Sequence, residues 1–130
     1  MSFDVFMRAF RAGEAADGDG AAAMEVLAPL VTDRDDRWAR VTATDGESDV
    51  FGTDDPASGL TFHHASGLAI WQVMFDAARA GGFVVLPIGG PACVPPGVAV
   101  ADVPDGHDGD VRTVTTGDEL RRAITGTPDP

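Results

Sequence analysis

The sequence predicts an α+β fold in which a mainly antiparallel sheet carries two or three helices on one face. Two observations favour this class. Short stretches with the apolar patterns of strands are interrupted by segments with the 3.6-residue period of amphipathic helices. Hairpin and helix patterns also mix along the chain instead of alternating strictly, which argues against a parallel sheet built from βαβ units.

The expected elements follow the order β-α-β-β-β-α-β-β-α within a single domain, residues 1–130. They are strand 2–10, helix 21–28, hairpin 38–52, strand 60–65, helix 67–80, strand 83–89, strand 111–116 and helix 116–124.

The first strand is predicted from the alternation of apolar and polar residues, and the end of the first helix from a proline that breaks it. Residues 2–10 alternate apolar and polar side chains, as a half-buried strand does. Asp19 or Gly20 then opens a helix, which must end near Ala28 because Pro29 cannot continue it without losing a hydrogen bond.

The middle of the chain combines a hairpin, a strand and the longest helix. Val and Thr residues flank Asp45-Gly46, a pair that readily adopts the positive φ angles of a tight turn. The strand LTFHHA follows, and Ser66 can cap the helix after it. An apolar stripe with helical spacing ends at Gly81, where a left-handed residue is wanted.

The last third opens with FVVLPIG, a continuously apolar strand typical of a central position. The Pro- and Gly-rich segment 89–110 is expected to be a long loop, with a short strand or turn at 98–100. The strand VRTVTT then runs into a helix, where Thr116 and Glu119 form a capping box.

Composition predicts a soluble, cytoplasmic protein. The 130 residues suit one domain, and no apolar run approaches the ~20 residues that span a bilayer. The first residues lack the basic region of a signal peptide. One cysteine forms no internal disulfide, which fits a reducing compartment.

The net charge of the chain indicates which classes of partner it can bind. Acids number 21 against 9 bases, all of them Arg, for a net charge of −12. Nucleic acid is excluded as a ligand, because phosphate contacts need clustered basic residues. The absence of Lys and Tyr indicates a gene from a high-GC genome, whereas an acidic surface for a basic protein partner is the functional interpretation.

The acids cluster around the hairpin. Three precede it (Asp33, Asp35 and Asp36), three lie within it (Asp45, Glu47 and Asp49), and two follow (Asp54 and Asp55). If the hairpin lies at a sheet edge, its tip and flank form one acidic patch with Trp38 as an aromatic anchor. The predicted binding residues are Trp38, Asp45, Glu47, Asp49, Asp54 and Asp55. A soluble edge hairpin protected by charge is the structural alternative.

Two adjacent histidines are the first alternative site. In a regular strand, Leu60, Phe62 and His64 would face one side and His63 the other. The two histidines should then not share a metal, since a site needs both rings within about 2.1 Å of the ion. On this interpretation His64 is partly buried and His63 is freer.

Cys93 is the third residue of this alternative site. The segment GGPACVPPG offers no helix N-terminus to lower the pKa of its thiol, so a free, half-buried thiol is expected. A small enzyme or metal-dependent hydrolase with a site around His63, His64 and Cys93 is the rival hypothesis. No cofactor and no metal are predicted, because the Asp-rich loops 17–20 and 105–110 lack calcium-loop spacing and the Gly-Gly of LPIGGP lacks the Lys of a phosphate loop.

Three segments, MSFDVFMRAF, DVFG and VTTGDELRRAI, resemble a group of small uncharacterised bacterial proteins of actinobacterial type. The resemblance implies a compact α+β domain and carries over no catalytic residue. In size and charge the chain is also similar to bacterial immunity proteins. We therefore expect a non-enzymatic, acidic binding protein for a basic protein partner, immunity- or regulator-like.

Overall fold

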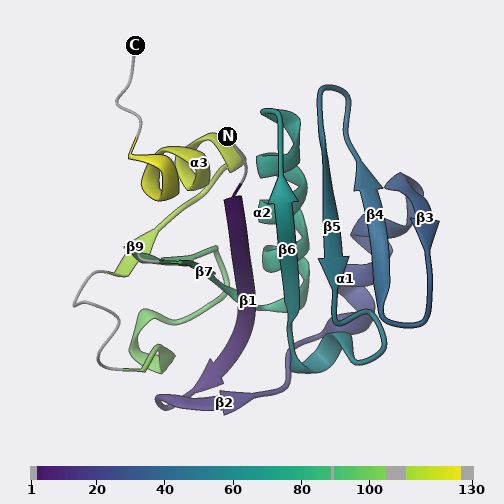
Figure 1. Ribbon diagram of the computed structural model, residues 1–130. Coiled ribbons are helices and arrows are strands. Elements are labelled where there is room, and N and C mark those ends of the chain that lie inside the picture. Colours follow the sequence, from purple (N-terminus) through teal and green to yellow (C-terminus); the bar gives the residue numbers. More distant parts are fainter. Residues whose placement is uncertain (1–2, 89, 105–110, 127–130) are drawn as a thin grey trace.

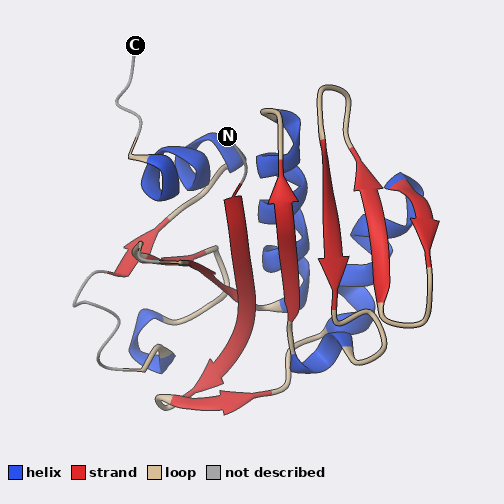
Figure 2. Cartoon of the chain, viewed as in Figure 1, coloured by secondary structure: helices blue, strands red, loops and turns tan. Residues whose placement is uncertain are grey.

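The computed structural model describes residues 3–88, 90–104 and 111–126, and its chain path is shown in Figures 1 and 2. A nine-stranded sheet has the order β3-β4-β5-β6-β1-β7-β8-β9, with β2 paired to β1. Every pairing is antiparallel except that of β8 with β9. The predicted α+β class with a mainly antiparallel sheet is confirmed.

The strands are β1 (Phe3–Arg11), β2 (Glu14–Ala16), β3 (Val31–Arg34), β4 (Trp38–Thr42), β5 (Glu47–Phe51), β6 (Leu60–Ala65), β7 (Val84–Pro87), β8 (Ala92–Val94) and β9 (Val111–Thr113). The helices are α1 (Gly20–Leu27), α2 (Ala69–Gly81) and α3 (Gly117–Thr125), with short 3₁₀ turns η1 (Ala28–Leu30), η2 (Pro56–Ser58) and η3 (Val100–Asp102).

Three strands, β2, β3 and β8, are absent from the predicted order. Each has only three or four residues, too few for an alternating pattern to stand out from a loop. The predicted long loop contains β8, and of the short strand or turn expected at 98–100 the structure has a turn, the 3₁₀ turn at Val100–Asp102. The Asp-rich loop at 105–110, which was not expected to bind a metal, lies outside the described residues.

Helices cover one face of the sheet, with α1 and α2 behind the strands in the view of Figure 1. Strand residues of one parity point to that side and are fully buried, among them Val5 in β1, Val50 in β5 and Phe62 in β6. Helix α3 packs against α2 and adds Leu120 to the same core. The opposite parity of β3 to β6 therefore faces away from the helices.

A second, smaller cluster covers part of that opposite face. Val84, Ala92, Val94 and Val103 are buried together there, against Phe10 of β1. The segment that follows β8 thus covers β7, β8 and the end of β1. The face without helices is left open over β3 to β6 and the start of β1, and this is called the open face below.

The helix ends mostly follow the predicted signals. Asp19 accepts a hydrogen bond from the Ala22 amide at 3.0 Å, and α1 ends at Leu27, two residues before Pro29. Thr116 accepts from the Glu119 amide at 3.1 Å, which is one half of the predicted capping box, whereas the Glu119 carboxylate accepts the amide of Thr115 at 2.8 Å in place of that of Thr116. Among the described residues, none of the helices has the length and apolar character needed to cross a membrane.

Helix α2 differs from the prediction at both ends. Ser66 does not cap it, because its hydroxyl bonds to the backbone of Glu47 instead. The left-handed residue after the helix is Gly82, with φ of 70°, and not Gly81. The residue that satisfies the first amides of α2 comes from the distant β4–β5 turn.

Candidate functional site

Strand β6 loses its regular geometry at His64. The residue has φ of +53°, in the left-handed region, and the pairing with β1 shifts register there. Two β6 residues, His63 and His64, consequently face one β1 residue, Asp4, as in a β-bulge. Ala65 is buried and His64 is exposed, so the expected burial of His64 on the helix side was wrong. The bulge reverses the alternation at that residue.

The bulge brings three metal-binding groups together. His63 Nδ1 lies 2.9 Å from Asp4 Oδ1, and the same oxygen accepts the His64 amide at 3.0 Å. The centroids of the two imidazole rings are 3.9 Å apart. One ligand atom from each side chain lies within 4.8 Å of the others. Sequence reasoning missed Asp4, which belongs to a different strand, and wrongly expected the rings to diverge.

Cys93 does not join the histidines. It is fully buried in β8, and not half-buried as expected, because it lies opposite Val85 on the side of the sheet that the helices cover. Three strand spacings separate β8 from β6, roughly 14 Å at the usual strand separation. His63 also projects from the opposite face, since its neighbour Phe62 is the buried one. A shared site of Cys93 with the histidines is therefore not assembled.

Asp45 connects the β4–β5 turn to helix α2. Its carboxylate accepts the amides of Leu68 at 2.9 Å and Ala69 at 3.0 Å, which are the first donors of the helix. These hydrogen bonds hold the pKa of Asp45 below its ordinary value. The carboxylate thus closes the helix end, which the sequence analysis had assigned to Ser66.

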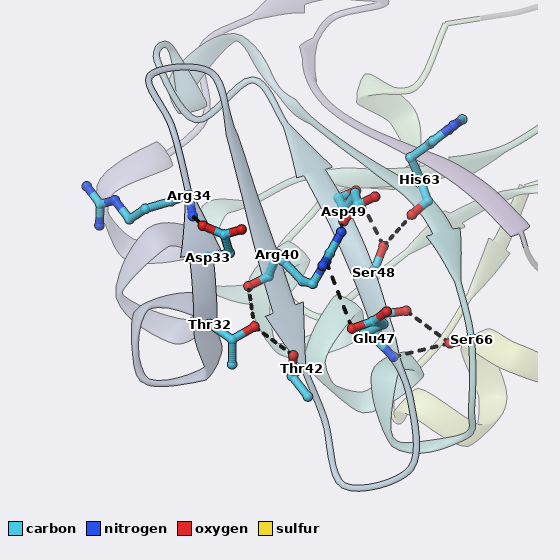
Figure 3. A network of polar contacts seen from close by, with 10 residues as sticks. All are labelled: Thr32, Asp33, Arg34, Arg40, Thr42, Glu47, Ser48, Asp49, His63 and Ser66. Carbon is cyan, nitrogen blue, oxygen red and sulfur yellow. Dashed lines mark hydrogen bonds and ion pairs between the residues drawn. The ribbon is translucent and has the colours of Figure 1, made fainter.

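Glu47 and Asp49 share one cation. Arg40 Nε lies 3.2 Å from Asp49 Oδ1 and 3.9 Å from Glu47 Oε2, as Figure 3 shows. The hydrogen bond and charge of Asp49 raise the pKa of Arg40, with a smaller contribution from Glu47. Both acids lie on the open face, but their charge is partly neutralised within the chain. The same guanidinium lies 5.4 Å from the Trp38 ring centroid.

Asp54 and Asp55 lie at the other end of the hairpin from Asp45. Both are exposed in the connection between β5 and β6, and Asp55 accepts a hydrogen bond from the Ser58 hydroxyl at 2.6 Å. Five strand residues separate the two ends, roughly 17 Å of extended chain. The five predicted acids of the hairpin are therefore divided between its two ends and its middle.

Trp38 lies at the second of these ends, in the wall of a hollow of about 630 Å³ between α1 and the β3–β4 hairpin. The hollow is lined by Met24, Ala28, Val31, Arg34, Asp35, Asp36, Trp38, Ala39 and Thr53. Asp35 and Asp36 were noted in the sequence but not included among the predicted binding residues. Their position two and three residues before Trp38 was the available signal.

Comparisons of the chain with protein-family models, with curated proteins and with solved structures found no match.

Proposed function

We propose that this is a non-enzymatic protein that binds a basic protein partner, in the manner of an immunity or regulatory factor. The observation that carries the proposal is the meeting of Trp38 with Asp35 and Asp36 in one hollow at the edge of the sheet. A Lys or Arg side chain of the partner is the group that this hollow suits.

The lining matches both parts of such a side chain. Met24, Ala28 and Val31 offer an apolar wall for the methylene stem, and Asp35 and Asp36 in the same lining offer carboxylates for the charged head. On the open face, outside the hollow, the Trp38 ring already holds one guanidinium, that of Arg40, at a distance typical of cation–π contacts.

The surroundings extend the contact surface. Phe51 pairs with Trp38 across β4 and β5, is 43% exposed on the open face, and lines a second, shallower hollow together with Asp55. Asp54 and Asp55 follow Thr53, which lines the hollow. The net charge of −12 would steer a basic protein towards this edge and raise its association rate.

The test begins with capture from a lysate of the source organism, with washes at low and high salt and identification of the bound proteins. The affinity of the purified partner is then measured for Trp38→Ala and for the double variant Asp35→Asn/Asp36→Asn. Each should weaken binding at least about tenfold, as truncation of a central interface residue does.

Two control variants match these changes elsewhere on the surface. Asp17→Asn/Asp118→Asn removes the same charge from exposed positions away from the hollow, and Leu68→Ala shortens an apolar side chain that is 64% exposed. Both should bind within about twofold of the unmodified chain, since substitutions outside a contact surface are nearly neutral. Equal losses in the Asp35/Asp36 variant and in its charge control would reject the hollow as the contact point.

A further inference from the structure

We propose that Asp4, His63 and His64 bind one divalent transition-metal ion of the zinc class. The inference is independent of any protein partner, because the three residues lie at the β1–β6 bulge and none of them lines the Trp38 hollow.

The side chains have the chemistry and spacing that such an ion requires. Imidazole and carboxylate ligands bind Zn²⁺ at about 2.0–2.2 Å, so neighbouring ligand atoms around a tetrahedral ion are roughly 3.3–3.6 Å apart. His63 Nδ1 and Asp4 Oδ1 are already 2.9 Å apart. The third ligand atom lies within 4.8 Å of both, and rotation of the exposed His64 side chain can close the remaining distance.

Ion binding replaces one existing contact. The ion would occupy the space between His63 Nδ1 and Asp4 Oδ1 in place of the proton that Nδ1 donates to the carboxylate, and the coordinated imidazole would carry its one remaining proton on Nε2. Asp4 Oδ1 also accepts the His64 amide, and this hydrogen bond holds the carboxylate beside both rings.

The backbone at His64 is what makes the three groups converge. A left-handed φ of +53° is unfavourable for a residue with a Cβ, and glycine or asparagine would adopt it more readily. In a regular strand the rings would instead point to opposite faces of the sheet. The chain thus places a potential ligand at a position where its backbone conformation is unfavourable.

The surroundings favour a cation and leave it accessible. Asp49 is the register partner of His63 on β5, and the ring of Phe51 meets that of His63 edge-on with centroids 6.0 Å apart. Arg40, the nearby base on β4, is held by Asp49 and Glu47. Three protein ligands leave further coordination positions to water. Two imidazoles and one carboxylate select zinc, cobalt, nickel or copper over calcium and magnesium.

The test is a titration of the full chain, purified without a polyhistidine tag and stripped with chelator, with Zn²⁺ followed by calorimetry. One ion per chain is expected. Asp4→Asn, His63→Ala and His64→Gly should each weaken binding by roughly 10–100-fold, in the range seen when a group supporting a metal site is lost. Titration with Co²⁺ should give visible absorption bands that the three variants reduce together.

Matched controls separate this site from adventitious binding. Asp54→Asn removes an exposed carboxylate elsewhere, and His107→Ala removes the third histidine of the chain, which lies outside the described residues. Both should bind Zn²⁺ like the unmodified chain. Circular dichroism establishes that each variant is folded. No stoichiometric binding, or the same affinity in the three site variants as in the two controls, overturns the proposal.

Discussion

The two faces of the sheet differ in the interactions that their side chains make: apolar packing on the helix-covered face and polar contacts on the open face. On the helix-covered face, Ser48 is the buried polar side chain among the described residues, and its hydroxyl donates to the His63 carbonyl at 3.1 Å. On the open face, Arg40, Asp49 and His63 lie side by side on successive strands. Packing therefore determines which residues fit the helix-covered face, whereas the side chains of the open face are accessible to ligands. Substitutions on the two faces should change different measured quantities.

The largest effect is expected in the covered core. Phe62→Ala should lower the free energy of unfolding by about 3–5 kcal/mol, because it leaves a cavity among fully buried side chains. Chemical denaturation measures it. Phe51→Ala, on the open face and 43% exposed, should change the same quantity by less than about 1 kcal/mol. Similar losses in both variants would mean that the open face is covered in solution.

A second effect is expected where the hairpin turn meets β6. A Cβ on Gly46 would overlap the carbonyl oxygen of Ser66, so Gly46→Ala forces the two segments apart. The free energy of unfolding should fall by about 1–3 kcal/mol, the usual range for overpacking. Thr44→Ala, in the same turn but exposed, is the control and should be nearly neutral.

The link between Asp45 and α2 predicts a dependence on pH. The pKa of Asp45 is lowered in the folded state, so its stabilising contribution is present above the ordinary carboxyl pKa of about 4. It is lost as the pH falls through the lower folded-state pKa. Asp45→Ala should reduce Tm by a few degrees at pH 7, and the difference from the unmodified chain should shrink in acid.

Thermal unfolding of both proteins from pH 7 to pH 2 measures this difference. Asp54→Ala is the matched control, since it removes an exposed acid that caps no helix. A difference between the Asp45 variant and the unmodified chain that stays constant down to pH 2 would show that the carboxylate charge is not responsible.

The smallest effect on stability is expected at the bulge. His64→Gly removes the strain of a left-handed φ at a residue with a Cβ, but it also raises the conformational entropy of the unfolded chain. The free energy of unfolding should therefore stay equal or rise by up to about 1 kcal/mol. His63→Gly has no such relief and should destabilise by about 0.5–1 kcal/mol. Chemical denaturation of the two variants compares them. A clear loss in His64→Gly would show that the ring itself stabilises the folded state.

The fold was largely predictable because its main signals are local. The period of the α2 stripe, the Pro29 stop, the Asp45-Gly46 hairpin and the Thr116 cap each depend on residues close in sequence. The strands that were missed are short, and their identity depends on partners elsewhere in the sheet. The parallel pairing of β8 with β9 has no local signature at all.

The candidate sites were less predictable because they are made of residues distant in sequence. Asp4 and His63 are separated by most of the first half of the chain, and a bulge that no motif announces brings them together. Asp45 looked like one acid in a patch, yet its partner is the backbone of α2. A run of acids does not specify which of them will find a donor.

The sequence by itself determined the class of fold and the strong negative charge, since these follow from short-range periodicity and composition. Only the tertiary structure decided which face each histidine occupies, which acids are already paired and where Trp38 meets carboxylates. The physical reason is that a single change in strand register reverses side-chain orientation, and register is set by contacts between strands rather than within them.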